Sequence, residues 1–328
     1  MDATRQFAGF DKIIRLTESK KAKLKRSRAN LRDHIRTYFK EHKWDEVKFY
    51  SQGSLALDTN LNPIPTGEEE YEEYDIDDGV YSKCKKDVRP TEDTFHRRIY
   101  AAVQDVTGKV IDKNTCIRVV YAEGYHVDLP MYWLDSECEN PVPQLAHKVK
   151  GYFDSDPREF SWWAAEKIAK SKDRSQLKRL IRYFKAWVDY REHCNSQIKL
   201  PCGFILTILA CNNYVADDLD DRAFARTANA ILQSLTTNFV CYRPTTPVGE
   251  ELLGAKNYDR ELLLKEFGKV ADDSSRSIET DSQEKATALW QGIFGDRFPR
   301  IEDVGEKKVT DAGSTNSSFT PDAPWSAP

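Results

Sequence analysis

The stretch Tyr74-Asp75-Ile76-Asp77-Asp78-Gly79-Val80-Tyr81 decides the fold of this 328-residue chain. Its Ile, Val and Tyr residues are typical of a β-strand. Side chains two positions apart lie on the same face of a strand, so Asp75 and Asp77 are predicted to project together while Asp78 points the other way. Paired carboxylates suit a metal ion, although an acidic segment with no further signal is more often simply solvated.

A third carboxylate is predicted on a neighbouring strand. Residues 116–122 and 125–133 have the pattern of a hairpin that turns at Glu123-Gly124, and Asp128 lies in its second arm. Two carboxylates on one strand and a third on its neighbour can hold two hard cations about 4 Å apart, the arrangement used for displacement at phosphorus. One cation would carry a triphosphate, and the other would lower the pKa of an attacking hydroxyl.

A turn about twenty residues upstream predicts a phosphate-binding element. Val47–Tyr50 has the pattern of a strand, Gln52-Gly53-Ser54 that of a turn, and residues 55–57 that of a helix start. Gly53 lets the backbone approach a ligand closely, and Ser54 with nearby amides can bind a phosphate. Each motif is common alone. The turn, the Asp-x-Asp strand and a strand aspartate about fifty residues later are together far more specific.

The remaining patterns predict a helical framework around this strand region. Residues 19–41 carry nine basic and two acidic residues with apolar positions at helical spacing, which predicts a long helix. Its charge suits either a solvated face or a surface for phosphates and nucleic acid. One further helix is predicted over 91–106. From about residue 150 onward the pattern is helical, with a helix that begins at Asp156 and others over 177–188, 204–214, 221–235, 259–270 and 287–294. The composition beyond Val304 is typical of a flexible tail.

Composition excludes several classes of protein. The chain has 49 Lys and Arg against 53 Asp and Glu, and no apolar run approaches the ~20 residues of a membrane span. Residues 1–6 lack the apolar core of a signal peptide. Seven scattered cysteines without a Cys-x-x-Cys pair indicate reduced thiols rather than disulfides or a zinc site. We therefore expect a cytoplasmic protein without a membrane segment.

The combined motifs resemble those of the DNA polymerase β nucleotidyltransferase superfamily. More narrowly, they resemble the bacterial cGAS/DncV-like nucleotidyltransferases, or CD-NTases, which make cyclic oligonucleotide second messengers in anti-phage (CBASS) defence. The likeness is carried by residues 51–54, 74–81 and 126–132, the last two closest to the cyclic GMP–AMP synthase branch, and it continues to about residue 298. It implies an α+β fold with a polymerase-β-like core of mixed sheet and helices, a helical carboxy-terminal lobe, and an active site in the cleft between them.

This resemblance implies a division of the chain and a set of metal ligands. The nucleotidyltransferase core with its long helix would cover 1–150, the helical lobe 151–304 and the flexible tail 305–328. Asp75 and Asp77 would bind two Mg²⁺ ions, with Mn²⁺ able to substitute. Asp128 would complete the site.

The resemblance also implies nucleotide-binding residues. Gln52, Gly53 and Ser54 would contact the donor nucleotide and its triphosphate, and Arg118 matches an arginine near the nucleotides. Lys185 matches a lysine that reaches the triphosphate. Lys178, Arg182 and Lys185 would form a basic stripe along one side of a helix. The alternative interpretation is that this stripe is simply exposed to solvent. The family often has a serine at the start of the next helix, whereas this chain has Cys202, a weak donor.

The implied activity is that of a cyclic oligonucleotide synthase. It would join nucleoside triphosphates, with ATP and GTP expected, release pyrophosphate and close a ring of the cyclic GMP–AMP type. The chain lacks the zinc-binding thumb of the vertebrate sensors, so no nucleic-acid activator is expected. Expected partners are a downstream effector that reads the product and a ubiquitin-transfer-like enzyme that conjugates the carboxy-terminal end. Two alternatives stay open: a nucleotidyltransferase with linear products or another acceptor, and a non-catalytic nucleotide- or RNA-binding protein.

Overall fold

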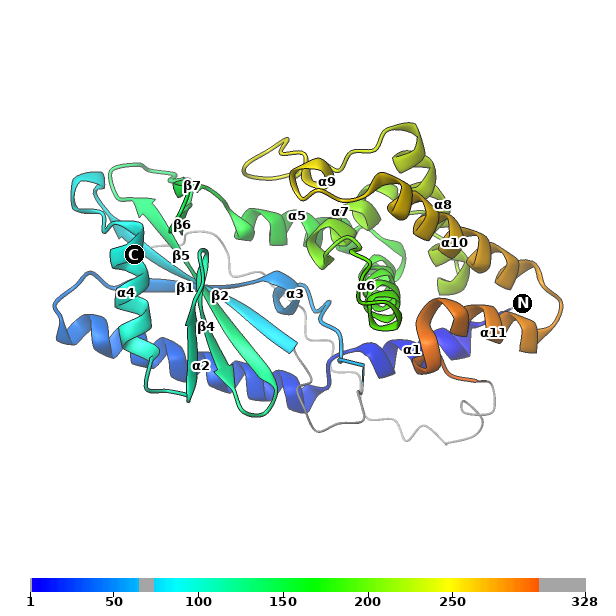
Figure 1. The fold of residues 1–328 in the computed structure, drawn as a ribbon, viewed down its shortest axis with the longest axis horizontal. Coiled ribbons are helices and arrows are strands. Elements are labelled where there is room, and N and C mark those ends of the chain that lie inside the picture. The colour runs from blue at the N-terminus through cyan, green and yellow to red at the C-terminus, as the bar shows by residue number, and fades with distance from the viewer. Residues whose placement is uncertain (1, 65–73, 301–328) are drawn as a thin grey trace.

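The computed structural model describes residues 2–64 and 74–300 of the chain, which form two lobes side by side (Figure 1). One lobe is built on a mixed sheet with the strand order β1-β2-β5-β4-β3, to which β6 and β7 are added beside β5. The strands are β1 (Val47–Gln52), β2 (Tyr74–Cys84), β3 (Lys109–Asp112), β4 (Cys116–Tyr121), β5 (Tyr125–Asp135), β6 (Gln144–His147) and β7 (Gly151–Asp154).

The strand register aligns four candidate residues in one row across the sheet. Strand β1 runs antiparallel to β2, β2 parallel to β5, and β5 antiparallel to β4. Residues directly opposite each other in neighbouring strands share a face. The register partners Gln52↔Asp77, Asp77↔Asp128 and Asp128↔Arg118 therefore form a continuous row on that face, and they are contributed by β1, β2, β5 and β4.

Two helices cover the opposite face of the sheet. Helix α2 (Glu18–Glu41) begins at Thr17, whose side chain accepts a hydrogen bond from the Lys20 amide, and helix α4 (Glu92–Val103) is capped in the same way by Thr91. Their apolar sides share one core with the inward residues of β2, β4 and β5. The predicted basic helix is thus confirmed as a long structural element against the sheet.

The second lobe is helical and has its own core. Its helices are α5 (Pro157–Ala169), α6 (Gln176–Cys194), α7 (Gly203–Asn213), α8 (Asp220–Thr237), α9 (Leu252–Ala255), α10 (Arg260–Glu279) and α11 (Gln283–Phe294). Helix α1 (Thr4–Ile14) and the turn η3 (Gly295–Arg297) complete it, because Phe7 and Phe10 lie in a cluster of aromatic rings with α6 and α11. None of the helices in the described part of the chain is long and apolar enough to cross a membrane.

The structure confirms the strands expected around 47–50, 74–81, 116–122 and 125–133 and the expected helices. Most ends shift by a few residues, but the helix predicted over 259–270 extends to Glu279. Five α-helices and strands of the described residues were not predicted: α1, α9, β3, β6 and β7. The helical region was expected to begin near residue 150, and this is wrong by a few residues because β7 still pairs with β6. The predicted domain boundaries stay predictions. The acidic residues 66–73 and the predicted tail 305–328 lie outside the described residues.

Candidate active site

Three carboxylates lie on the face of the sheet opposite α2 and α4. Asp75 and Asp77 project from β2, and Asp128 on β5 stands beside Asp77 in the register, as the alternation of the strand predicts. Burial, together with the negative charges of Asp75 and Asp128, raises the pKa of Asp77 to about 7. The three side chains are therefore close enough to repel one another. Such a cluster favours the binding of a cation.

The turn that follows β1 contacts this cluster directly. Gly53 begins the short helix α3 (Gly53–Ala56), two residues earlier than expected, with a φ of +69°. A Cβ atom at this position would lie 2.2 Å from Oδ2 of Asp77. Only glycine accommodates both the left-handed backbone and this close approach. The sequence motif thus corresponds to a turn packed against a predicted metal ligand.

Gln52 and Ser54 flank this glycine and lie beside the same row. The Gln52 amide nitrogen donates to the hydroxyl of Tyr132 at 3.2 Å, and its Oε1 is buried without a hydrogen-bond partner among the described residues. The Ser54 hydroxyl accepts a hydrogen bond from the Asn60 amide at 2.8 Å. Both residues therefore keep hydrogen-bonding capacity for a ligand.

Arg118 binds Asp128 rather than projecting freely. Its Nε and Nη2 donate to the two carboxylate oxygens of Asp128, each at 2.7 Å, and this pairing raises the pKa of the guanidinium above its usual value. The structure thus places Arg118 in the predicted site, but as the partner of a predicted ligand. Whether it also contacts nucleotides stays a prediction.

The donor set fits divalent cations. Among residues 2–64 and 74–300, no group of three His, Cys, Asp or Glu side chains is already converged as for a bound metal. Asp75 and Asp77 nevertheless share a strand face, and their negative charges act on each other. Asp128 keeps free lone pairs, since an ionised carboxylate has about four acceptor sites and Arg118 occupies two. Hard oxygen ligands of this kind suit Mg²⁺ or Mn²⁺.

Lys185 approaches the site from the helical lobe. Its Nζ atom donates to the main-chain oxygen of Thr59 at 3.0 Å, and burial lowers its pKa to about 8. Arg182 is 2% exposed and Lys178 forms an ion pair with Asp58 at 3.3 Å. The alternative of a solvated basic stripe is therefore wrong, because all three cations face the loop after α3.

Cys202 is the N-cap of α7, and its thiol makes no capping hydrogen bond. The Sγ atom instead accepts from Nζ of Lys256 at 3.6 Å. The role of the next residue, Gly203, was not predicted: a Cβ atom there would lie 2.7 Å from Cε of Lys185, so the glycine leaves room for this side chain. Phosphate binding by Cys202 stays a prediction.

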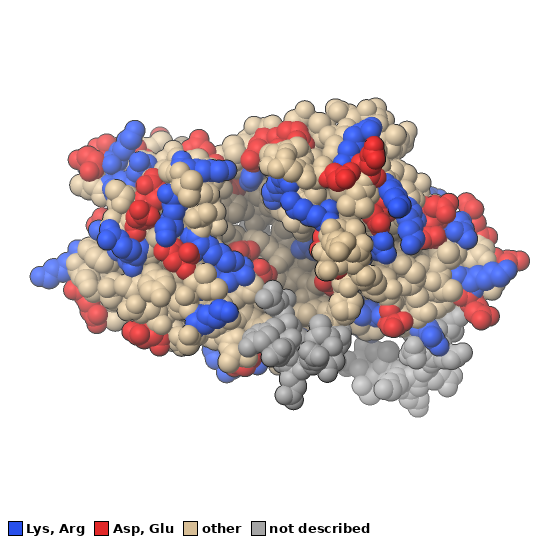
Figure 2. Space-filling view, in the orientation of Figure 1, with Lys and Arg blue, Asp and Glu red and all other residues tan. Residues whose placement is uncertain are grey.

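The contacts made by the loop after α3 were not predicted. Asp58, Thr59 and Asn60 connect the helical lobe to the Ser54 turn, and loop residues of this kind give no periodic signal in a sequence. The molecule is hollowed between its two lobes (Figure 2), in the region bordered by β2, α3 and α6 (Figure 1).

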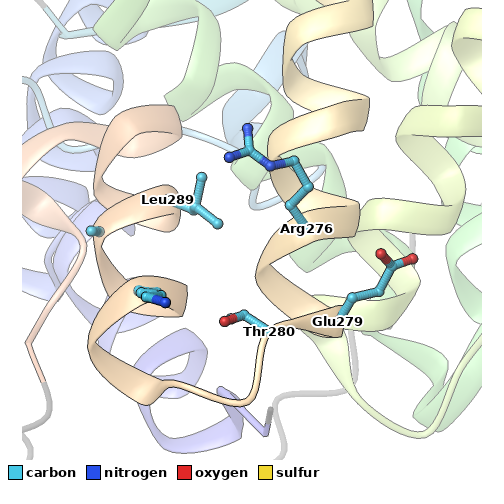
Figure 3. Close-up of a pocket in the computed structure, with 6 residues that line it drawn as sticks. Arg276, Glu279, Thr280 and Leu289 are labelled. Carbon is cyan, nitrogen blue, oxygen red and sulfur yellow. The ribbon is translucent and has the colours of Figure 1, made fainter.

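A separate depression of about 520 Å³ lies between α10 and α11 (Figure 3). None of the predicted site residues lines it. Its lining residues are Arg276, Glu279, Thr280, Lys285, Ala288 and Leu289.

Known proteins share both the sequence motifs and the fold. Residues 47–132 match the family described as cyclic GMP-AMP synthase DncV-like, nucleotidyltransferase domain. A cyclic GMP-AMP synthase of Escherichia albertii is 26% identical over 219 residues, which cover 65% of this chain and 47% of that protein. A cyclic GMP-AMP synthase of Escherichia coli is 29% identical over 119 residues, which cover 32% of this chain and 26% of that protein. The chain thus matches about half the length of the first relative and about a quarter of the second.

Solved structures confirm the expected α+β fold with a helical lobe. Vibrio cholerae DncV cyclic AMP-GMP synthase in complex with nonhydrolyzable GTP has a TM-score of 0.77 at 19% identity, over 92% of this chain and 98% of that one. The same enzyme in complex with the linear intermediate 5′ pppA(3′,5′)pG has a TM-score of 0.76 at 18% identity, over 92% of this chain and 97% of that one. At these identities the likeness establishes the fold.

Proposed function

Because this chain belongs to the bacterial cGAS/DncV-like nucleotidyltransferases, we propose that it joins nucleoside triphosphates into a cyclic oligonucleotide with release of pyrophosphate. The substrates are ATP and GTP, and the product is of the cyclic GMP–AMP type. The observation that carries this proposal is the row that brings Asp77 and Asp128 together, with the Gly53-Ser54 turn packed on Asp77. The turn proposed to bind the triphosphate thus lies directly beside the carboxylates proposed to bind the metal ions.

The proposed mechanism assigns the carboxylates to two divalent cations. Asp75 and Asp77 would hold the ions, and Asp128 would complete the site with the lone pairs that Arg118 leaves free. When bound, such cations lower the pKa of an attacking hydroxyl and stabilise charge at the phosphorus. Mg²⁺ is the expected ion and Mn²⁺ a substitute. By binding both carboxylate oxygens, Arg118 fixes the orientation of Asp128.

The remaining polar groups position the donor nucleotide. The Ser54 hydroxyl donates to a triphosphate oxygen, and Lys185 neutralises triphosphate charge from the opposite lobe. Because they come from different lobes, these contacts hold the triphosphate in line with the attacking hydroxyl, and such positioning supplies much of the acceleration in phosphoryl transfer. Gln52 offers a buried acceptor beside them.

The biological setting is proposed from family membership. We infer that the enzyme acts in the cytoplasm in anti-phage defence, without a nucleic-acid activator, and that an effector protein reads its product. A ubiquitin-transfer-like enzyme would conjugate the carboxy-terminal end. That end lies outside the described residues.

Labelled nucleoside triphosphates with Mg²⁺ test the proposed reaction. The wild-type protein should release pyrophosphate and form a product that resists phosphatase, because a ring has no terminal phosphate. Asp75→Asn with Asp77→Asn should abolish both signals. The thermal melting temperature of this double variant should be equal or higher, since the repulsion that raises the Asp77 pKa is removed.

Asp154→Asn, at the end of β7 and outside the row, is the matched control and should keep full activity. Undiminished pyrophosphate release by the double variant would overturn the assignment of the carboxylates. A phosphatase-sensitive product would instead indicate a linear-product or acceptor-modifying nucleotidyltransferase. Nucleotide or RNA binding without pyrophosphate release would indicate a non-catalytic protein.

A further inference from the structure

Asn60 bridges the predicted phosphate-binding turn and the carboxylate strand. It lies in the loop after α3 and is 6% exposed. Its Nδ2 atom lies 2.8 Å from the Ser54 hydroxyl oxygen and 3.4 Å from the main-chain oxygen of Asp75. A main-chain carbonyl can only accept a hydrogen bond, so the amide nitrogen, and not its oxygen, must face this pair. The contact with Asp75 therefore fixes the orientation of the amide.

This orientation determines the direction of the Ser54 proton. Because Asn60 donates, the Ser54 oxygen accepts, and the hydroxyl hydrogen stays available for another acceptor. No second partner of this hydroxyl is found within residues 2–64 and 74–300. Phosphate oxygens only accept. A triphosphate is therefore the kind of ligand that completes the hydrogen bonds of Ser54.

The Asn60 amide is held in this orientation at some energetic cost. Its Oδ1 atom is buried and has no hydrogen-bond partner among the described residues. Buried acceptors are rarely left unpaired in native proteins, and each exception calls for an explanation. The explanation here is that Nδ2 is required at Ser54 and Asp75, which leaves Oδ1 facing away from both.

Both lobes fix the loop that carries Asn60. The Asp58 carboxylate forms ion pairs with Lys21 of α2 at 2.6 Å and with Lys178 of α6 at 3.3 Å. The Thr59 amide donates to the main-chain oxygen of Ser54 at 2.9 Å, and the Thr59 oxygens accept from Lys185. The loop therefore holds Asn60 in place before any ligand binds.

We propose that Asn60 is a positioning residue which directs the Ser54 proton toward the triphosphate of the donor nucleotide. This inference rests on the proposed function. Asn60 does not touch the triphosphate itself, and it acts through the hydroxyl of Ser54. Its effect should therefore appear in the binding of the donor nucleotide and should vanish when that hydroxyl is absent.

A double-mutant cycle between Asn60 and Ser54 tests this dependence. Asn60→Ala should raise the KM for the donor triphosphate about 3- to 10-fold and leave kcat within about twofold. In a Ser54→Ala background, the same substitution should change KM by less than about twofold, because the hydroxyl through which it acts is gone. Asn62→Ala is the matched control. Asn62 lies in the same loop, its side chain accepts a hydrogen bond from Lys20 of α2, and the KM of this variant should be unchanged.

A second variant covers the case in which Asn60→Ala does not fold. Asn60→Asp keeps the shape but replaces the donor with an acceptor, so Ser54 would donate to the new carboxylate and lose its proton for the triphosphate. Its effect on KM should exceed that of Asn60→Ala in the wild-type background. This difference in KM between Asn60→Asp and Asn60→Ala should become smaller when Ser54 is alanine. The comparison therefore separates the effect of the lost hydrogen bond from that of the added negative charge.

The outcomes distinguish this inference from the proposed function. If the wild-type protein releases no pyrophosphate, the proposed reaction fails, and calorimetric binding of nonhydrolysable GTP with Mg²⁺ still measures the cycle. If the wild-type protein is active but the effects of Asn60→Ala and Ser54→Ala are additive, only the role of Asn60 is overturned. Equal KM values for Asn60→Ala and Asn62→Ala would also overturn it.

Discussion

Replacing Gly53 with alanine tests the contact between the turn and the carboxylate strand. With its φ of +69°, the residue has a left-handed backbone, which costs an alanine about 1–2 kcal/mol of folding free energy. The new Cβ atom would also lie 2.2 Å from Oδ2 of Asp77. At that separation either the turn or the carboxylate must move. Gly53→Ala should therefore lower stability through the backbone and lower activity through Asp77.

Gly249→Ala separates these two effects. Gly249 has a φ of +82°, and a Cβ atom built there meets no other atom within 4 Å. Both variants should lose about 1–2 kcal/mol, which corresponds to a fall of roughly 2–8 °C in melting temperature for a chain of this size. Only Gly53→Ala should lower the rate of pyrophosphate release, by about 100-fold. A displacement of about 1 Å at a reacting centre has an effect of that size on the rate.

The assay pairs thermal melting with the rate of pyrophosphate release well below the melting temperature. We expect the two variants to have similar melting temperatures and very different rates of pyrophosphate release. Equal rates for Gly53→Ala and Gly249→Ala would show that the turn does not constrain Asp77, and the proposed link between the turn and the metal site would be wrong.

Two further predictions follow from groups with shifted pKa values. Because the pKa of Asp77 is raised to about 7 and a bound cation requires the ionised form, calorimetric Mg²⁺ affinity should fall about tenfold per pH unit below pH 7. The same raised pKa means that the free energy of unfolding of the metal-free protein falls as pH rises from the ordinary carboxyl pKa of 3.8 to about 7. Asp77→Asn should remove the contribution of this carboxyl to the fall. An unchanged pH dependence of stability in that variant would contradict the prediction. Lys185→Ala should raise the KM for the donor triphosphate about 10- to 100-fold, the effect of a lost hydrogen bond to a charged group, with little change in melting temperature. Because the pKa of Lys185 is lowered to about 8, the wild-type KM should also rise above pH 8 while that of the variant stays flat there.

The local patterns around the carboxylates correctly predicted their strands and the faces on which they lie. The alternation along Tyr74–Tyr81 predicted which aspartates share a face, and the hairpin pattern predicted the strand of Asp128. Both signals are local, because strand periodicity and turn residues depend on neighbouring positions. The row from Gln52 to Arg118 could not be predicted in this way. It depends on how distant strands pair, and β2 and β5 are joined through a long connection.

The interactions of individual side chains were predicted less well. Arg118 was expected near nucleotides, and its ion pair with Asp128 was not predicted. That ion pair depends on the register between β4 and β5, which places the two residues opposite each other. The role of Gly203 depends on where Lys185 crosses from another helix, and no local pattern reports this. Strands β3, β6 and β7 were missed because each has only four residues, too few to show alternation.

The consecutive residues Asp77 and Asp78 support the proposal that the face of the sheet opposite α2 and α4 is the functional one. Asp78 is fully buried on the opposite face, where Arg32 of α2 donates to both of its oxygens at 2.7 Å and 2.6 Å. Asp77 forms no ion pair with any described residue and stands beside two further carboxylates, which raise its pKa. Burying a carboxylate without a counter-ion destabilises a fold, so the protein neutralises Asp78 with a dedicated arginine. The neighbouring charge of Asp77 has no such partner, and a cation bound with the substrate is the partner that the arrangement lacks.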